Sequence, residues 1–381
     1  MWDRNNLYTL LTETGIMALR VGFLQTRFSA VGPGGGELHT EHLARALEER
    51  GHSVTIFTDS PAERRDGIED LDVQEYDTPF AVNPINELAL ANAARDDFEQ
   101  CDVLTMTDES AFGAVGASVP TVMVFHLVWH GWVDRHRPIW NIVRSKPQVL
   151  IYRQMEHRIC KNADAIVSIS QNIRSDIDLI GDFENKIHDI PNGVNLDRFQ
   201  PIDERTDDFT VHFQGRLVEM KNPNVVVEAV AHSDSNWNLT IGGAGPLRDD
   251  LEKRVEQYGL NDRITFLGYL PSEDLPKRYA ESHVYVLPST YEGMPLTVLE
   301  AAASGTATVV TPRSATDFVT DDMGVVVSTD PGELASTLDT LAANPERVKR
   351  MGDAARDRAE QYSWDRIAAE YEVLYNSLAE T

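Results

Sequence analysis

Short apolar runs alternate with amphipathic segments along the chain, and this alternation restricts the fold more than any other feature. The first apolar run, residues 19–24, leads through a glycine-rich loop at 31–36 into a helix expected over 37–49 and a strand over 53–57. The second half repeats this order from the strand 209–213. Strands that alternate with helices predict an α/β fold, here with two Rossmann-like, doubly wound domains.

The segments between these points follow the same alternation, with one interruption. Residues 60–83 are polar and irregular, so no regular element is expected there. The other expected elements are a helix over 86–98, a strand over 102–106, a helix over 111–117, a strand over 121–125, and later helices near 331–343, 345–361 and 364–378.

The charge balance is strongly acidic. There are 61 Asp and Glu residues against 34 Lys and Arg, and the formal net charge is −27. This balance argues against a nucleic-acid partner. It is typical of a halophilic protein from a salt-loaded cytoplasm, where salt screens the repulsion between like charges. A strongly acidic mesophilic protein is the alternative.

Cysteine usage and the first residues bear on the compartment. Cys101 and Cys160 lack metal-type spacing and are expected to be small buried hydrophobes in a reducing compartment. No apolar run reaches eighteen residues, and residues 1–16 lack the basic flank and apolar core of a signal peptide. Met17 begins the first strand directly, so we treat 1–16 as an N-terminal extension and expect a cytoplasmic protein.

Two glutamates surround a predicted strand–helix junction in the second half. Glu292 follows the apolar run 283–287 and precedes Pro295, which suits the start of a helix because its missing N–H is not needed there. Open α/β sheets bind ligands at this edge, and the helix N-terminus favours an anion. Glu300 lies eight residues later, so both carboxylates can contact one ligand at different depths. The alternative is a solvated Glu292 and an ordinary surface Glu300.

Other candidate residues follow predicted strands. Arg216 and Lys221 share one loop before a helix, where a planar guanidinium and an ammonium suit a diphosphate. His126 ends the strand 121–125 at the ligand edge, although a lone histidine there is more often structural. The loop 31–36 lacks the dinucleotide glycine spacing, so no nicotinamide site is expected, and it lets backbone approach a ligand or forms a surface turn.

These motifs resemble a known family. Glu292 and Glu300 match a Glu-x7-Glu signature inside a Tyr-Glu-Gly-x-Pro context, and residues 215–222 match a Gly-Arg-Leu-x-x-x-Lys-Asn loop. Both are similar to retaining glycosyltransferases with the GT-B fold, of the family 4 type (glycosyl transferases group 1). The resemblance covers roughly residues 18–380. Together with the acidic composition it suggests a haloarchaeal source.

The resemblance implies a two-domain organisation around a central cleft. An acceptor domain would span 17–200, a charged linker 201–208, and a nucleotide-sugar-binding domain 209–362. In the family, the last helix, here within 363–381, crosses back onto the first domain. Closure of the cleft would exclude water and limit hydrolysis of the donor.

The resemblance also implies residue roles and a mechanism. Glu292 would accept hydrogen bonds from the donor sugar, Glu300 would bind the ribose, His126 would lie beside the sugar, and Arg216 and Lys221 would stabilise the leaving diphosphate in place of a metal. The expected catalytic residues are Glu292, His126, Arg216 and Lys221. The expected donor-binding residues are Gly34, Gly35, Gly36, Arg216, Lys221, Gly268, Tyr269, Glu292, Gly293, Met294, Leu296, Thr297 and Glu300. No metal or other cofactor is expected, and the donor would be a nucleotide sugar such as a UDP- or GDP-hexose.

A basic, aromatic stretch interrupts the acidic background. Residues 131–161 hold seven Lys or Arg against two acids, with Trp129, Trp132 and Trp140 beside or among them. Such a stretch predicts peripheral contact with an anionic membrane, or a phosphorylated or lipid-linked acceptor, at the cytoplasmic face. The alternatives are a packed helix with a basic outer face and a soluble acceptor.

Three other functions are alternatives to the glycosyltransferase on sequence grounds. A sugar-nucleotide epimerase uses a similar scaffold, but that group generally lacks the combination of Glu-x7-Glu with Arg and Lys. A phosphorylase needs a lysine for pyridoxal phosphate, and Lys253, Lys277 and Lys349 lack a convincing context. A non-catalytic nucleotide-sugar-binding subunit would bind the donor without turning it over.

Overall fold

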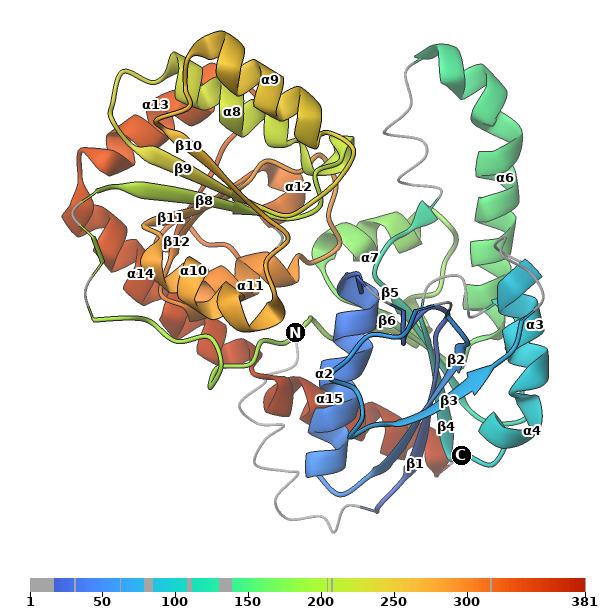
Figure 1. The fold of residues 1–381 in the computed structure, drawn as a ribbon. Helices are drawn as coiled ribbons and strands as arrows, with labels where there is room; N and C mark the ends of the chain where they lie inside the picture. The colour runs from blue at the N-terminus through green and yellow to red at the C-terminus, as the bar shows by residue number, and fades with distance from the viewer. Residues whose placement is uncertain are drawn as a thin grey trace. The chain divides into compact units, whose positions relative to one another are not determined.

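The computed structural model describes residues 17–380, except 31, 62, 79–84, 108–111, 130–138, 204, 207 and 316, and except the side chains of 139–149 and 315. The chain divides into two compact units. Unit 1 comprises residues 1–192 and 364–381, and unit 2 comprises 193–363. Each unit is a parallel sheet flanked by helices, which confirms the predicted α/β class (Figure 1).

Unit 1 is built on a seven-stranded sheet with the order β3-β2-β1-β4-β5-β6-β7, in which every described pair is parallel. Its central strands are buried along their whole length because helices cover both faces. The strands are β1 (Arg20–Leu24), β2 (Ser53–Asp59), β3 (Asp72–Tyr76), β4 (Val103–Thr107), β5 (Thr121–Phe125), β6 (Ala165–Ser168) and β7 (Ile187–Asp189).

The helices of unit 1 come from both ends of the chain. They are α2 (Gly35–Glu49), α3 (Ile85–Ala93), α4 (Arg95–Phe98), α6 (Ile139–Asn162), α7 (Gln171–Asp178) and α15 (Trp364–Ala379). Helices α2 and α15 lie side by side (Figure 1). No helix among the residues that the structure describes is long and apolar enough to span a membrane.

Buried polar contacts attach α15 to unit 1. The fully buried Glu372 accepts hydrogen bonds from Arg50 at 2.6 Å and from His52 at 2.8 Å. The Nδ1 atom of His52 accepts the backbone N–H of Leu19 at 3.2 Å, so its Nε2 atom carries the proton donated to Glu372. The C-terminal helix is thereby tied to the start of β1 and the end of α2.

Unit 2 is built on a six-stranded parallel sheet with the order β10-β9-β8-β11-β12-β13. Its strands are β8 (Thr210–Gln214), β9 (Asn238–Gly242), β10 (Ile264–Gly268), β11 (Val284–Leu287), β12 (Ala307–Val310) and β13 (Gly324–Val326). Its helices are α8 (Pro223–His232), α9 (Arg248–Tyr258), α10 (Leu275–Glu281), α11 (Leu296–Ala303), α12 (Pro312–Ala315), α13 (Pro331–Ala342) and α14 (Pro345–Ala359).

The structure differs from the sequence-based expectations at two elements of unit 1. Strand β3 lies within 60–83, where no element was expected. Its sequence is polar because it is an edge strand that pairs with β2 alone, so it lacks the apolar pattern of a buried strand. Residues 113–116 form turns rather than part of a helix over 111–117. Gly116 adopts a φ of +83°, which an α-helix cannot contain.

The boundary between the units falls at residue 192 rather than in the expected linker 201–208. The segment after the boundary is bound to the rest of unit 2. Val194 donates its N–H to the carbonyl of Tyr362 at 2.8 Å, and Arg205 donates to the carbonyls of Ala280 and Gly305, each at 2.8 Å. Tertiary hydrogen bonds therefore place this charged segment inside unit 2.

Candidate functional site

The order of the strands in unit 2 indicates where a ligand would bind, namely between β8 and β11. From β8 the chain moves outward through β9 to β10, then returns to β11, which pairs with β8 on its other side. Ligands of open parallel sheets bind at such a switch, at the carboxyl ends of the two strands. The loops that leave β8 and β11 carry Arg216, Lys221 and Glu292.

Lys221 and Glu292 form an ion pair across these two loops. The Nζ atom of Lys221 lies 2.6 Å from Oε1 of Glu292, which is 8% exposed. The loops are also joined through their backbones, because Thr290 donates its N–H to the carbonyl of Met220 at 2.9 Å. Asn222, directly after Lys221, adopts a left-handed φ of +53°. Asparagine adopts this backbone conformation more readily than most residues other than glycine. Arg216, on the β8 loop, is exposed.

A second glycine loop supports the loop that carries Arg216. The N–H of Gly215 donates to the carbonyl of Gly242 at 3.1 Å, and that of Leu217 to Ala244 at 2.9 Å. A Cβ atom on Gly243 would lie 1.9 Å from the carbonyl oxygen of Gly215, and φ at Gly243 is +123°. Only glycine fits there, so the close contact between the two loops depends on it.

Glu300 lies on α11, in a largely buried setting. Burial raises its pKa from the usual value of 4.5 to about 7, while a hydrogen bond from Tyr279 and the positive charge of Arg198 act in the opposite direction. The phenol of Tyr279 donates to Oε2 of Glu300 at 3.0 Å. The carboxyl group of Glu300 therefore gains or loses its proton near neutral pH.

Helix α11 begins next to the ion pair. Its N-cap is Pro295, which supplies no side-chain hydrogen bond, and the N–H of Val298 donates to the carbonyl of Pro295 at 3.1 Å. The N–H groups of Leu296 and Thr297, before it, have no capping side chain and can bind an anion. Met294 is buried, whereas Leu296 and Thr297 are half-buried at the start of the helix. Gly293 lies in the same loop and is buried. These residues follow Glu292 directly and complete the predicted set on this strand–helix junction.

Gly268 and Tyr269 lie at the carboxyl end of β10, two strands from β8. The carbonyl of Gly268 accepts the N–H of Gly243 at 2.6 Å, and Gly268 adopts a φ of +70°. Tyr269 is 69% exposed. Its ring is thus available to contact a flat apolar group at this edge.

In unit 1 the predicted glycines start α2. Gly34 is the N-cap residue, and its N–H donates to Oε2 of Glu37 at 2.9 Å. Gly35 is exposed, with no atom within 4 Å of where a Cβ would be. Gly36 follows in the first turn. The switch of this sheet lies between β1 and β4, and the loop that leaves β1 leads to these glycines.

His126 directly follows β5 and lies in an aromatic cluster of unit 1. Its ring centroid is 4.6 Å from that of His39, in an edge-to-face arrangement. Burial lowers the pKa of both rings, that of His39 to about 4. His39 is held at 2.9 Å from Oδ1 of Asn192. Both imidazoles are therefore neutral at pH 7.

Part of the basic stretch lies outside the described residues, namely 130–138 and the side chains of 139–149, with Trp132, Arg135, Arg137, Trp140, Arg144 and Lys146. The described part of α6 exposes Arg153, Arg158 and Lys161, and also Leu150 and Ile151. Trp129 stacks on Tyr152 with a centroid distance of 5.7 Å. Its ring is therefore engaged within unit 1.

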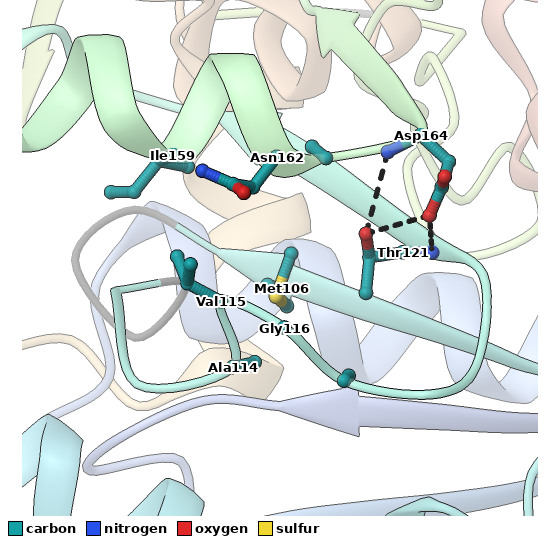
Figure 2. A pocket seen from close by; sticks show the side chains of 10 residues that line it. Met106, Ala114, Val115, Gly116, Thr121, Ile159, Asn162 and Asp164 are labelled. Atoms are coloured by element: carbon teal, nitrogen blue, oxygen red, sulfur yellow. Dashed lines mark hydrogen bonds between the residues drawn. The ribbon is translucent and has the colours of Figure 1, made fainter.

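A small pocket of unit 1 lies at the other end of β5 from His126. Its volume is about 120 Å³, and it is lined mainly by small or apolar side chains such as Met106, Val115 and Ile159 (Figure 2). Among its polar groups, Thr121 donates its N–H and its hydroxyl to Asp164 at 2.8 and 3.0 Å, and Asn162 donates to the carbonyl of Arg158 at 2.7 Å. This pocket is separate from the predicted site residues.

Sequence reasoning did not single out several residues of this arrangement. Tyr279 had no sequence signal. Asn222 belongs to the matched loop 215–222, but its contact with the carbonyl of Pro288, like that of Tyr279 with Glu300, joins distant segments and was not predicted. His39 sits within a helix that was predicted, but its ring contact with His126 depends on the fold. The glycines of the loop 242–247 are needed because this loop packs closely against the backbone of Gly215 and Leu217, which are distant in the sequence.

Two family models together match most of the chain. Residues 33–198 match the model described as Glycosyltransferase Family 4, and residues 196–358 match Glycosyl transferases group 1. The chain is also similar to the MMP alpha-(1->4)-mannosyltransferase of Mycolicibacterium hassiacum. The two are 26% identical, over 94% of this chain and 98% of the relative.

Solved structures share the fold at low sequence identity. The sucrose-phosphate synthase from Thermosynechococcus elongatus has a TM-score of 0.82 and 20% identity, covering 94% of this chain and 98% of its own. HepE from Anabaena, solved in complex with UDP-glucose, has a TM-score of 0.74 and 18% identity, covering 95% and 100%. The chain belongs to the glycosyl transferases group 1 and is a glycosyltransferase with the GT-B fold.

Proposed function

We propose that this glycosyltransferase moves a hexose from a nucleoside diphosphate sugar to a hydroxyl or phosphate acceptor with retention of the anomeric configuration and without a metal ion. The observation that carries the proposal is the Lys221–Glu292 ion pair at the carboxyl ends of β8 and β11. A donor offers a partner to each member of the pair. Its diphosphate would form an ion pair with Lys221, and its sugar hydroxyls would donate hydrogen bonds to Glu292.

The charges of unit 2 suit the leaving group. Arg216 and Lys221 lie on one supported loop and would neutralise the negative charge that grows on the departing diphosphate. The free N–H groups at the start of α11 would add to this stabilisation. Two protein cations and a helix N-terminus together can supply the electrostatic stabilisation that a metal ion supplies elsewhere.

The proposed transfer is a substitution at the anomeric carbon on one face of the sugar. The bond from the anomeric carbon to the diphosphate oxygen breaks, the bond to the acceptor oxygen forms, and the acceptor proton passes to the leaving phosphate. Glu292 holds the sugar hydroxyls, and Glu300 binds the ribose. His126, neutral because of its burial, contributes a hydrogen bond to the sugar rather than a charge.

For the acceptor we propose a phosphorylated or lipid-linked molecule at an anionic membrane surface. The exposed face of α6 supports this, since Leu150 and Ile151 are 59% and 57% exposed and lie next to the exposed Arg153 and Arg158. Apolar side chains beside basic ones are typical of helices that lie on anionic lipid. The relative from Mycolicibacterium hassiacum is named as a mannosyltransferase, which favours including GDP-mannose among the donors.

Donor turnover tests the proposal. The purified protein, in molar potassium chloride with a chelator, is given UDP- and GDP-hexoses with and without polyprenyl phosphate vesicles, and released nucleotide is counted. The product anomer is assigned by NMR. We expect one donor to be turned over with retention, and the lipid to increase the rate.

Variants separate catalysis from folding. Lys221→Ala and Glu292→Gln are each expected to lower kcat/KM by about 100-fold or more, since each removes a group that acts on the transition state. Arg153→Gln together with Arg158→Gln should reduce only the stimulation by lipid. Donor binding without turnover with any acceptor would favour a binding subunit, and inversion of the anomer would reject the retaining mechanism.

A further inference from the structure

Tyr279 occupies a closed position beside Glu300. It lies on α10, is fully buried, and its phenol donates to Oε2 of Glu300 at 3.0 Å. Its ring meets those of Tyr285 and His212 edge to face, with centroid distances of 5.5 and 5.8 Å. Its backbone carbonyl accepts the hydroxyl of Thr306 at 2.7 Å. Ring and backbone are both fixed, so the direction of the phenol O–H is fixed as well.

We propose that Tyr279 is a positioning residue that orients the Glu300 carboxylate toward the ribose of the donor. The inference rests on the proposed function, in which Glu300 binds the ribose hydroxyls. Because the phenol occupies Oε2, it leaves Oε1 and the second lone pair of Oε2 for the two ribose hydroxyls. A carboxylate accepts at both oxygens only when it is ionised.

The surroundings of Glu300 make its charge sensitive to this contact. Burial raises its pKa to about 7, and the hydrogen bond from Tyr279 and the guanidinium of Arg198 lower it. Tyr285 of β11 faces the same group, and burial raises the pKa of that phenol well above its usual value, so it stays neutral. His212 of β8, beside Tyr279, is also neutral because burial lowers its pKa to about 4.

The proposal predicts that loss of the Tyr279 hydroxyl changes how the donor KM depends on pH. Below the pKa of Glu300, donor binding must first remove a proton, so the donor KM rises as pH falls. Tyr279→Phe removes the bond that favours the ionised carboxylate, so this rise should begin at higher pH. Tyr285→Phe deletes the same kind of hydroxyl from the same cluster, but that hydroxyl donates to the carbonyl of Gln214 at 3.1 Å instead.

The experiment measures donor KM and kcat from pH 5.5 to 9 for the wild type, Tyr279→Phe, Tyr285→Phe and Glu300→Gln. For Tyr279→Phe we expect the midpoint of the KM rise to move up by about one pH unit, raising KM about threefold to tenfold near pH 7, with kcat at saturating donor within about twofold. Tyr285→Phe should keep the wild-type midpoint. Glu300→Gln should raise KM and abolish this pH dependence.

The outcomes distinguish a failure of this inference from a failure of the proposed function. If Tyr279→Phe gives the wild-type midpoint while Glu300→Gln raises KM, Tyr279 is structural and the proposed function stands. If Glu300→Gln leaves KM unchanged at every pH, the ribose assignment itself is wrong. If Tyr279→Phe does not fold, a fluorinated tyrosine incorporated at 279 tests the same point, because its stronger O–H donor should move the midpoint to lower pH. An unmoved midpoint there also overturns the inference.

Discussion

The ammonium of Lys221 and the carboxylate of Glu292 lie 2.6 Å apart although 71 residues separate them in the chain. The two side chains come from loops on neighbouring strands, and both are largely buried. A buried ion pair contributes little net stability, but removing one partner leaves an uncompensated charge. Each member of the pair thus supplies the counter-charge that makes burial of the other compatible with folding.

This relationship predicts coupled effects on stability. Lys221→Met and Glu292→Gln are each expected to lower the free energy of unfolding by about 1–3 kcal/mol, because each leaves the other partner buried without its counter-charge. The double variant should lose about 1–2 kcal/mol less than the sum of the two. Urea denaturation followed by circular dichroism measures all three values. Strictly additive losses would show that the pair is not coupled in solution.

The loop contact at Gly243 predicts a position that tolerates no side chain. Gly243→Ala would place a Cβ 1.9 Å from the carbonyl of Gly215, so we expect a loss of about 3 kcal/mol or more and a raised donor KM. Gly259→Ala is the matched control, since Gly259 also has a positive φ, +67°, but no neighbour within 4 Å. It should cost about 1 kcal/mol and leave the donor KM unchanged. Equal thermal shifts in both variants would contradict this account.

The raised pKa of Glu300 predicts the sign of a pH effect on stability. The folded protein holds this proton up to about pH 7, whereas the unfolded chain releases it near 4.5, so the free energy of unfolding falls as pH rises between these values. Glu300→Gln removes the effect. Between pH 4.5 and pH 8, the stability of the variant relative to the wild type should increase by on the order of 3 kcal/mol. Urea titrations at both pH values test this, and a constant difference would contradict it.

The attachment of α15 predicts that substitutions of the two carboxylate partners of Arg50 differ strongly in their effect on stability. Glu372→Gln leaves Arg50 without its buried counter-ion and should cost about 3 kcal/mol. The side chain of Asp365, the other partner of Arg50, is 61% exposed. Asp365→Asn should therefore lower the free energy of unfolding by only about 0.5 kcal/mol. Thermal unfolding of both variants gives the comparison. Similar losses would mean that Glu372 is not buried as the structure describes.

Local patterns were sufficient for most elements and for the chemical groups of the site. The apolar runs that became β5 and β11 are short and buried on both faces, so they could be recognised without tertiary information. The turn chemistry around Pro295 likewise placed Glu292 before α11. By contrast, β3 has a polar sequence and exists only because it pairs with β2. The predicted helix over 111–117 was wrong, because residues 113–116 form turns and Gly116 has a backbone angle that composition does not reveal.

The roles of individual site residues depended on contacts between distant segments. The alternation of strands and helices determined the class of fold and which loops carry Arg216, Lys221 and Glu292, because these are properties of neighbouring residues. The order of the strands, the pairing of Lys221 with Glu292 and the phenol of Tyr279 on Glu300 were decided only when the chain folded. Side-chain burial and charge depend on neighbours that are far away in the chain, and a raised pKa such as that of Glu300 exists only where tertiary packing excludes water.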